Sequence, residues 1–349
     1  MINPNTFTAN HIQGIRGNSK QDPSLIERTI FALGLLEAIA RAELTFIFKG
    51  GTSLMLLMDN PGRFSTDVDI VVAPGIDVIE YLDRAAAIWP FMQMQEDIRK
   101  ESSGLVKRHF RFSYVSPLSK KEASTLLDII YEDNPYSMTV VREIDNELLI
   151  TEDPVITVQI PNANCILSDK LTAFAPNTTG IRYNIGKELE IIKQLYDIAA
   201  LFDYIDNFAE VKSAYNKIVK TEILYRNLDK LPEDVLRDTI NTAACVAGRG
   251  RLYPDDYTKL KSGIDSIRNH IFSETFNGEV AVKKACIVMY IAVAILTNQD
   301  ELPAIKDDDF YLSSNIDFGK YSSLKHIRKM DILAYKYLTE AAIMLSVNK

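Results

Sequence analysis

The strongest constraint on this chain is a glycine turn that is followed shortly by two aspartates on one strand. A short apolar run, Leu44–Phe48, leads into the turn Gly50–Ser53, and an apolar segment long enough for a short helix follows it. The stretch Asp67–Val72 has the pattern of a strand, on which side chains two apart point to the same face. The carboxylates of Asp67 and Asp69 therefore lie side by side, which costs free energy unless a cation or hydrogen-bond donors offset them. This stretch predicts a metal site.

A third carboxylate belongs to the same prediction. Asp128 interrupts an otherwise apolar strand over residues 125–131, where a charge is expensive to bury without a partner. Asp67, Asp69 and Asp128 could converge on one or two Mg²⁺ ions, or Mn²⁺ in their place, because hard divalent ions prefer carboxylate oxygens. Two such ions roughly 4 Å apart stabilise both the attacking and the leaving oxygen in nucleotidyl transfer.

The glycine turn suits the phosphates of a nucleoside triphosphate (NTP). Glycine lets the backbone approach the phosphates closely, and a helix N-terminus supplies N–H donors together with a nearby hydroxyl. The turn is not a Walker A loop, because no GxxxxGK[ST] occurs and Lys49 precedes the glycines. The predicted phosphate-binding residues are Gly50, Gly51, Thr52 and Ser53.

Three further residues have two interpretations each. Arg63 and Ser65 lie in the loop before Asp67, either with a function, as a phosphate contact or a brace for the aspartates, or as ordinary loop residues. His109, in a strand over residues 109–114, is more consistent with an outward strand residue than with a catalytic base. Pattern alone does not decide between these roles.

Periodicity predicts an α+β fold, with a mixed β-sheet and flanking helices followed by an all-α C-terminal domain. Residues 1–20 are polar and show no helical pattern, and the first amphipathic helix spans 25–42. The acidic run 307–309 is expected to be a solvated loop. We predict domains at 1–165 and 166–349, the second with helices near 186–205, 208–221, 232–247, 255–271, 279–298 and 324–347.

Composition narrows the class of protein without revealing its function. The chain has 349 residues, of which 47% are hydrophobic, so it can bury a sizeable core. No apolar run approaches membrane-spanning length and no signal peptide is evident, so we expect a cytoplasmic protein with no membrane partner. Three widely spaced cysteines predict buried thiols instead of disulfides or a zinc site. The net charge of −8 argues against a general affinity for nucleic acid but leaves room for a local basic patch.

Taken together, these segments resemble the AbiEii/AbiGii toxin family of nucleotidyltransferases, within the DNA polymerase β-like superfamily. The resemblance covers about residues 25–205 and is carried by GGTSL, RFSTDVDIVV, LLDII, SDKLTAF and KQLYDIAALFD. It implies a minimal nucleotidyltransferase fold and a helical C-terminal domain that closes the nucleotide cleft. It also implies the toxin of a type IV toxin–antitoxin system used in abortive infection and phage defence, with a separately encoded antitoxin that forms no stable complex with it.

The family's motifs can be carried onto this chain position by position. The first motif falls on the glycine turn and on Asp67 and Asp69, and the second falls on Asp128. The third implies that Lys170 contacts the triphosphate, and the fourth implies a site role for Asp197, for which the structural alternative is a buried acid paired with Lys193. The third motif usually has Ser or Thr four residues after its lysine. Here that position is Phe174, and the candidate replacements are Thr172 and the Thr178–Thr179 pair.

The activity implied by this resemblance is metal-dependent transfer of a nucleoside monophosphate (NMP) from an NTP to an acceptor hydroxyl, an EC 2.7.7-type reaction that releases pyrophosphate. Related toxins point to the 3′ end of tRNA as the acceptor. Two alternatives stay open from the sequence. One keeps the chemistry but modifies a protein or a small molecule such as an aminoglycoside, and the other is a non-catalytic nucleotide-binding regulatory module.

Overall fold

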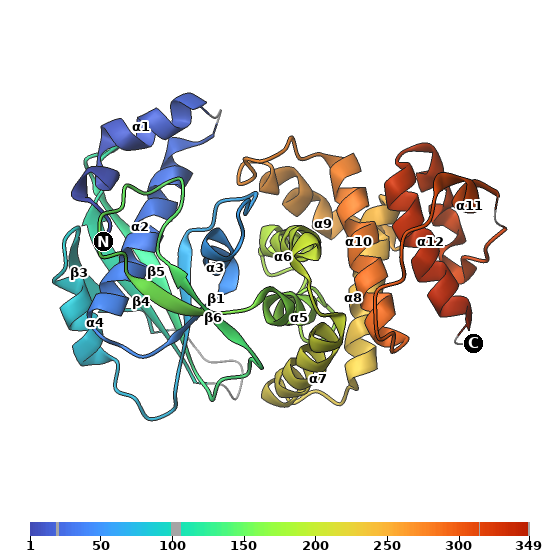
Figure 1. Ribbon diagram of the computed structural model, residues 1–349, viewed down its shortest axis with the longest axis horizontal. Coiled ribbons are helices and arrows are strands. Elements are labelled where there is room, and N and C mark those ends of the chain that lie inside the picture. The colour runs from blue at the N-terminus through green and yellow to red at the C-terminus, as the bar shows by residue number, and fades with distance from the viewer. Residues whose placement is uncertain (19–20, 99–105, 314, 348–349) are drawn as a thin grey trace. The chain divides into compact units, whose positions relative to one another are not determined.

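The chain divides into two compact units in the computed structural model (Figure 1). The first, which we call the sheet unit, comprises Met1–Asn162 together with the short segment Asn269–Glu274. The second, the helical unit, comprises Ala163–Arg268 and Thr275–Lys349. The structure describes residues 1–18, 21–98, 106–313 and 315–347.

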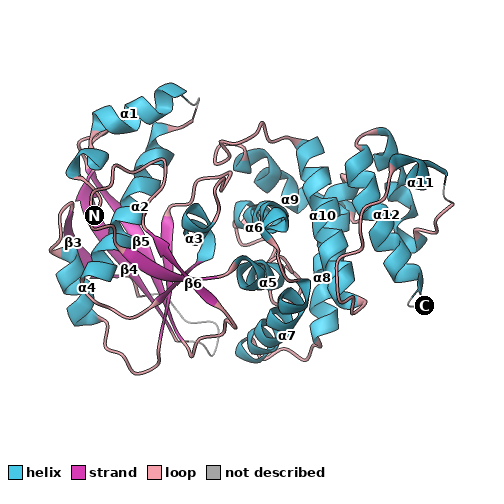
Figure 2. Cartoon of the chain, viewed as in Figure 1, coloured by secondary structure: helices cyan, strands magenta, loops and turns pink. Residues whose placement is uncertain are grey.

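The sheet unit is built on a five-stranded mixed sheet with the strand order β1-β2-β5-β4-β3. The strands are magenta in Figure 2, with helices of the same unit beside them. Strands β2 and β5 run parallel at its centre, and the other three pairings are antiparallel. Side chains alternate between a buried face and a half-exposed face along β2 and β5, as the period of two predicts. The strands are β1 (Ile47–Lys49), β2 (Asp67–Val72), β3 (Phe91–Glu96), β4 (Lys107–Val115) and β5 (Glu122–Tyr131).

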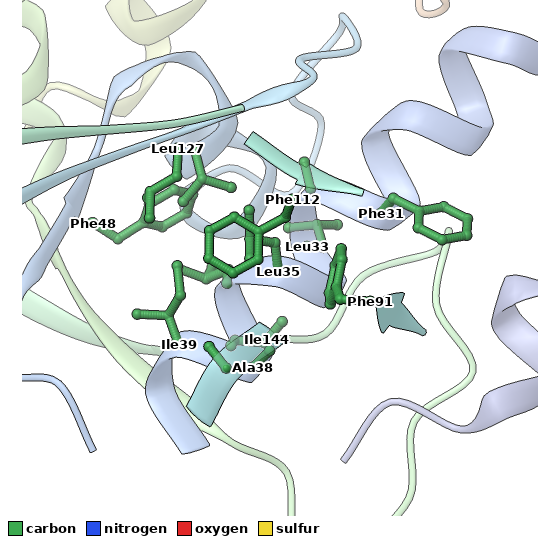
Figure 3. Close-up of a cluster of buried hydrophobic side chains, with 14 of the residues drawn as sticks. Phe31, Leu33, Leu35, Ala38, Ile39, Phe48, Phe91, Phe112, Leu127 and Ile144 are labelled. Carbon is green, nitrogen blue, oxygen red and sulfur yellow. The ribbon is translucent and has the colours of Figure 1, made fainter. Parts of the chain in front are cut away.

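Helix α2 (Pro23–Arg41) packs on the buried face of this sheet. It begins where the Asp22 side chain accepts a hydrogen bond from the Ser24 N–H at 2.9 Å, with proline in the first turn. Its apolar stripe meets aromatic and aliphatic side chains of the sheet (Figure 3). The ring of Phe31 stacks on that of Tyr114, with the two centroids 3.6 Å apart. The half-exposed face, opposite this core, carries the predicted carboxylates. The other helices here are η1 (Pro4–Phe7), α1 (Ala9–Asn18), α3 (Gly50–Leu57) and α4 (Ile79–Ala86).

The segment Asn269–Glu274 belongs to the sheet unit although it lies within the predicted C-terminal domain. Its backbone pairs with the loop that precedes β2: the N–H of Phe64 donates to the carbonyl of His270 at 2.9 Å, and that of Phe272 donates to Gly62 at 3.0 Å. The rings of Phe64 and Phe272 also pack, with centroids 4.6 Å apart. Pairing between residues this distant in sequence leaves no local pattern, which explains why the predicted domain 166–349 is continuous. A second, two-stranded sheet consists of β6 (Thr139–Glu143) and β7 (Thr157–Pro161).

The helical unit contains the predicted succession of helices. Helix α10 is almost wholly buried, and it packs against α6, α8 and α12. Among the described residues, no helix combines the length and apolarity needed to cross a membrane. The helices are α5 (Ala163–Ala173), α6 (Glu188–Leu201), η2 (Phe202–Tyr204), α7 (Phe208–Tyr225), α8 (Pro232–Gly248), α9 (Pro254–Ile267), α10 (Gly278–Leu296), α11 (Asp308–Ser313), η3 (Gly319–Lys329) and α12 (Ile332–Val347).

Several local predictions were wrong. The polar N-terminal region forms η1 and α1 although its sequence has little helical pattern, because Ile12 packs against the core and stabilises α1. The edge strand β3 is polar and short, and β6 is mostly exposed, so neither shows the alternation expected of a half-buried strand. The acidic run is solvent-exposed as predicted, but two of its aspartates form the first turn of α11, where negative charge is favourable. The predicted helix over 324–347 breaks before α12.

The cysteine prediction is confirmed. Cys165, Cys245 and Cys286 are all buried thiols. Burial raises the pKa of the Cys245 thiol to about 12, so this side chain stays protonated and unreactive near neutral pH.

Candidate active site

Four strands place polar side chains in one row on the half-exposed face of the sheet. Lys49 of β1 is opposite Asp69 of β2, and Asp69 is the direct neighbour of Asp128 on the parallel strand β5. On the far side of Asp128, His109 of β4 is its antiparallel partner. Neighbouring strands lie about 4.8 Å apart, so the carboxylates of Asp69 and Asp128 are adjacent. The row thus holds two like charges between two basic side chains.

Asp67 lies two residues before Asp69 on β2, so its side chain is on the same face but outside this row, and its partner on β5 is Leu126. Among the residues that the structure describes, no group of three or more His, Cys, Asp or Glu side chains is arranged to hold a metal ion. Mg²⁺ usually takes only one or two carboxylates from a protein and completes its shell with substrate phosphates and water. The adjacent carboxylates of Asp69 and Asp128 fit that requirement, and Asp67 is the nearest further carboxylate on β2.

The two glycines of the turn are where side chains from β2 and its preceding loop come closest to α3. Gly50 has a φ of +79°, and a Cβ there would lie 2.1 Å from Oδ2 of Asp69. A Cβ on Gly51 would lie 2.7 Å from Nη2 of Arg63 and 2.8 Å from Oγ of Ser65. A side chain at either glycine would therefore displace Asp69, or Arg63 and Ser65, so these predicted loop and strand residues lie around the turn.

The hydroxyls of the turn are used inside the protein. Thr52 and Ser53 are fully buried. The Thr52 hydroxyl donates to the carbonyl of Asp67 at 2.5 Å, and the Ser53 hydroxyl donates to the carbonyl of Gly50 at 2.9 Å. Helix α3 begins without a side-chain cap. Its first-turn N–H groups, rather than these hydroxyls, are thus the donors best placed for an anion.

Arg63 is buried beside the turn, with only 5% of its surface exposed. Its Nη1 donates to the carbonyl of Phe64 at 3.0 Å, and its backbone forms a β-bridge with Ile271. The distant segment Asn269–Glu274 therefore holds the loop that carries Arg63. This geometry supports a bracing role for the guanidinium, which lies against Gly51.

Replacing Gly50 with alanine is expected to impair the site more than the fold. The Cβ would collide with the Asp69 carboxylate and would also be strained at positive φ, for about 1–2 kcal/mol of lost stability. Gly75→Ala is the matched control, because Gly75 has a φ of +85° but open space around its Cα. Both variants should lower the thermal unfolding midpoint similarly, whereas only Gly50→Ala should lose nucleotide transfer. Full transfer by Gly50→Ala would contradict the packing of the turn on Asp69.

In the helical unit, Lys170 of α5 and Asp197 of α6 form a buried ion pair. Nζ of Lys170 lies 2.6 Å from Oδ2 of Asp197, and the two side chains are 6% and 1% exposed. The predicted structural alternative, a pair between Asp197 and Lys193, gives way to this contact, because Lys193 pairs with Glu190 at 3.1 Å instead. The structure brings together the two residues that the third and fourth motifs assign to the site.

The candidate replacements for the missing hydroxyl of the third motif donate within the helical unit. The Thr172 hydroxyl donates to the carbonyl of Asp169 at 2.7 Å, and the Thr178 hydroxyl donates to the carboxylate of Asp238 at 2.9 Å. Burial raises the pKa of Asp238, and hydrogen bonds from Asn177 and Thr178 oppose that rise. Any phosphate would have to compete with these bonds. Phe174 at the motif position is fully buried, as is Thr179, whose hydroxyl donates to the Thr172 carbonyl.

The sequence interpretation missed a partner of Asp128. Nδ1 of His109 lies 2.7 Å from Oδ1 of Asp128, and the imidazole is 18% exposed. Alternation along β4 correctly places His109 on the face opposite Phe110 and Phe112. Finding its partner also requires the β4–β5 register, which strand patterns do not reveal.

Most of the chain is similar to a known protein family. Residues 34–268 match the family described as "Nucleotidyl transferase AbiEii toxin, Type IV TA system". Among solved structures, the chain is similar to JHP933 from Helicobacter pylori, at 18% identity over 69% of this chain and 97% of that chain, with a TM-score of 0.36. A second H. pylori structure, provisionally assigned as a nucleotidyltransferase, has 17% identity over 68% and 97%, with a TM-score of 0.34. No curated protein sequence matches the chain.

Proposed function

Because the chain belongs to the AbiEii nucleotidyl transferase toxin family of type IV toxin–antitoxin systems, we propose that it transfers an NMP from an NTP to an acceptor hydroxyl. A bond forms between the acceptor oxygen and the α-phosphorus of the NTP. The bond from that phosphorus to the bridging α–β oxygen breaks, the hydroxyl proton passes to the Asp128 carboxylate and pyrophosphate leaves. The single observation that carries this proposal is the register of Asp69 beside Asp128, next to an uncapped helix N-terminus.

Each part of the site has a distinct task in this proposal. First-turn N–H groups of α3 bind triphosphate oxygens, and Gly50 and Gly51 permit the close approach. Asp69 and Asp128, with Asp67 beside them, hold Mg²⁺ or Mn²⁺, which when bound neutralises charge on the phosphate oxygens. Asp128 is also the carboxylate that we assign to orient the attacking hydroxyl. Arg63 and Ser65 keep the turn against β2.

The role of the helical unit rests on motif order. Lys170 is assigned to the triphosphate and Asp197 to the orientation of its ammonium, which the 2.6 Å contact supports. The contact with the buried carboxylate fixes the position of the Lys170 ammonium group.

We further propose that the acceptor is the 3′ end of an RNA, tRNA in particular, and that a separately encoded antitoxin counters this modification without a stable complex. The family description supports a toxin with a separate antitoxin. Modification of a tRNA 3′ end would stop translation, which accounts for toxicity through one covalent event.

A transfer assay with the full chain tests this function. The protein is incubated with each of the four α-³²P-labelled NTPs and, separately, with total tRNA, total soluble protein or an aminoglycoside. We expect label on tRNA, release of pyrophosphate, and loss of both when EDTA removes divalent ions. Label on protein or drug would replace the RNA acceptor, and NTP binding without transfer to any acceptor would instead indicate a regulatory nucleotide-binding module.

A further inference from the structure

His109 and Asp128 are joined by a short side-chain hydrogen bond within the polar row of the sheet. Nδ1 of His109 and Oδ1 of Asp128 are 2.7 Å apart, and the two residues are direct antiparallel partners in β4 and β5. An ionised carboxylate only accepts hydrogen bonds, so Nδ1 of the imidazole carries the proton that is shared. One oxygen of Asp128 is therefore committed to His109.

The hydrogen bond to His109 limits the orientations that the Asp128 carboxylate can take. Asp69 lies beside Asp128 on the other strand, and two adjacent like charges repel. Asp69 and His109 lie on opposite sides of Asp128, so repulsion from one and the hydrogen bond to the other favour the same orientation of the carboxylate. A donor on the opposite side holds one oxygen in place, which leaves the second oxygen in a defined orientation.

His109 is itself held firmly. Its strand β4 lies between β5 and β3, and the carbonyl of His109 accepts a hydrogen bond from the N–H of Asp97 at 2.7 Å. The imidazole is 18% exposed, whereas the Asp128 side chain is 36% exposed. The sheet therefore holds His109 in place, and the more exposed Asp128 is the residue that a ligand can reach.

We propose that His109 is a positioning residue that orients the Asp128 carboxylate toward a divalent cation. The inference deepens the proposed function, since it rests on the role assigned to Asp128. Hydrogen-bond partners of metal ligands commonly change metal affinity or activity by about 10–100-fold when they are removed. A purely structural bond between two strands would affect stability alone.

Two substitutions of His109 separate these roles. His109→Leu removes the donor and keeps a similar volume, whereas His109→Asn retains an N–H donor close to the place of Nδ1. Arg111→Leu is the matched control, because Arg111 lies two residues along β4 and pairs with Asp97 at 3.2 Å. Thermal unfolding checks that all three variants are folded.

The first readout is Mn²⁺ affinity of the full chain, measured by electron paramagnetic resonance of the free ion, and the second is the Mg²⁺ concentration for half-maximal transfer. We expect His109→Leu to weaken both by about 10–100-fold. His109→Asn should recover most of the loss, and Arg111→Leu should behave as the parent protein.

The two proposals fail in different ways. If His109→Leu matches Arg111→Leu in both readouts, His109 does not position Asp128, even though transfer by the parent protein still supports the function. If the parent protein transfers no NMP but binds Mn²⁺, and His109→Leu weakens that binding, the positioning role stands and the function is wrong. A parent protein that neither binds Mn²⁺ nor transfers NMP overturns both.

Discussion

Replacing Asp69 with asparagine should abolish nucleotide transfer while leaving the protein folded. The substitution keeps the size of the side chain that packs against Gly50 but removes one of two adjacent carboxylate charges. Loss of a group that stabilises charge in the transition state typically costs two to three orders of magnitude or more in rate, as a rough guide. Toxicity in cells should disappear together with transfer.

The free energy of unfolding of Asp69→Asn is a second measurement, independent of transfer. Asp69 is repelled by Asp128 on one neighbouring strand but faces Lys49 on the other, so the two effects of neutralising it oppose each other and stability should change by less than about 1 kcal/mol. Asp83→Asn, on the exposed side of α4, removes the same charge away from the site and should retain full transfer. Undiminished transfer by Asp69→Asn would falsify the assignment of Asp69 to the active site.

Replacing Lys170 with methionine should produce the largest loss of stability among these predictions. The substitution leaves the carboxylate of Asp197 buried without the ammonium that lies 2.6 Å away. Breaking a buried pair by removing one partner costs about 3–5 kcal/mol. Calorimetry should therefore show a much lower thermal unfolding midpoint for Lys170→Met.

A double variant separates stability from function at this pair. Lys170→Met with Asp197→Leu removes both charges, so most of the lost stability should return. Nucleotide transfer should not return, because the cation assigned to the triphosphate is absent. Lys193→Met is the control: its pair with Glu190 is more exposed, so the loss should stay below about 1 kcal/mol. A double variant with full transfer would exclude Lys170 from catalysis.

Much of the site could be predicted because its signals are local. The turn that starts at Gly50 and the strand that carries Asp67 and Asp69 lie within one short stretch, and a period of two places both carboxylates on one face. The mixed sheet and the helical succession after it likewise follow from periodicity. Asp128 was identifiable because a charge inside an apolar strand needs a partner.

Long-range pairing explains what could not be predicted. The segment Asn269–Glu274 supports the Arg63 loop through backbone hydrogen bonds that cannot be predicted from the sequence of the segment. Helix α1 and the edge strand β3 form because tertiary contacts outweigh weak local preferences. Lys170 was assigned by motif order, but the pairing of Asp197 with Lys170, and not with Lys193, depends on how α5 packs on α6.

By itself, the sequence determined which chemistry is available: a glycine turn, three carboxylates on strands, and a lysine and an aspartate on helices. The tertiary structure decided which of these groups meet. Strand register placed Asp69 beside Asp128 and gave Asp128 its partner His109, because hydrogen bonding between strands aligns residues far apart in the chain. Side-chain pattern specifies the face on which a residue lies, whereas only the folded sheet specifies its neighbour.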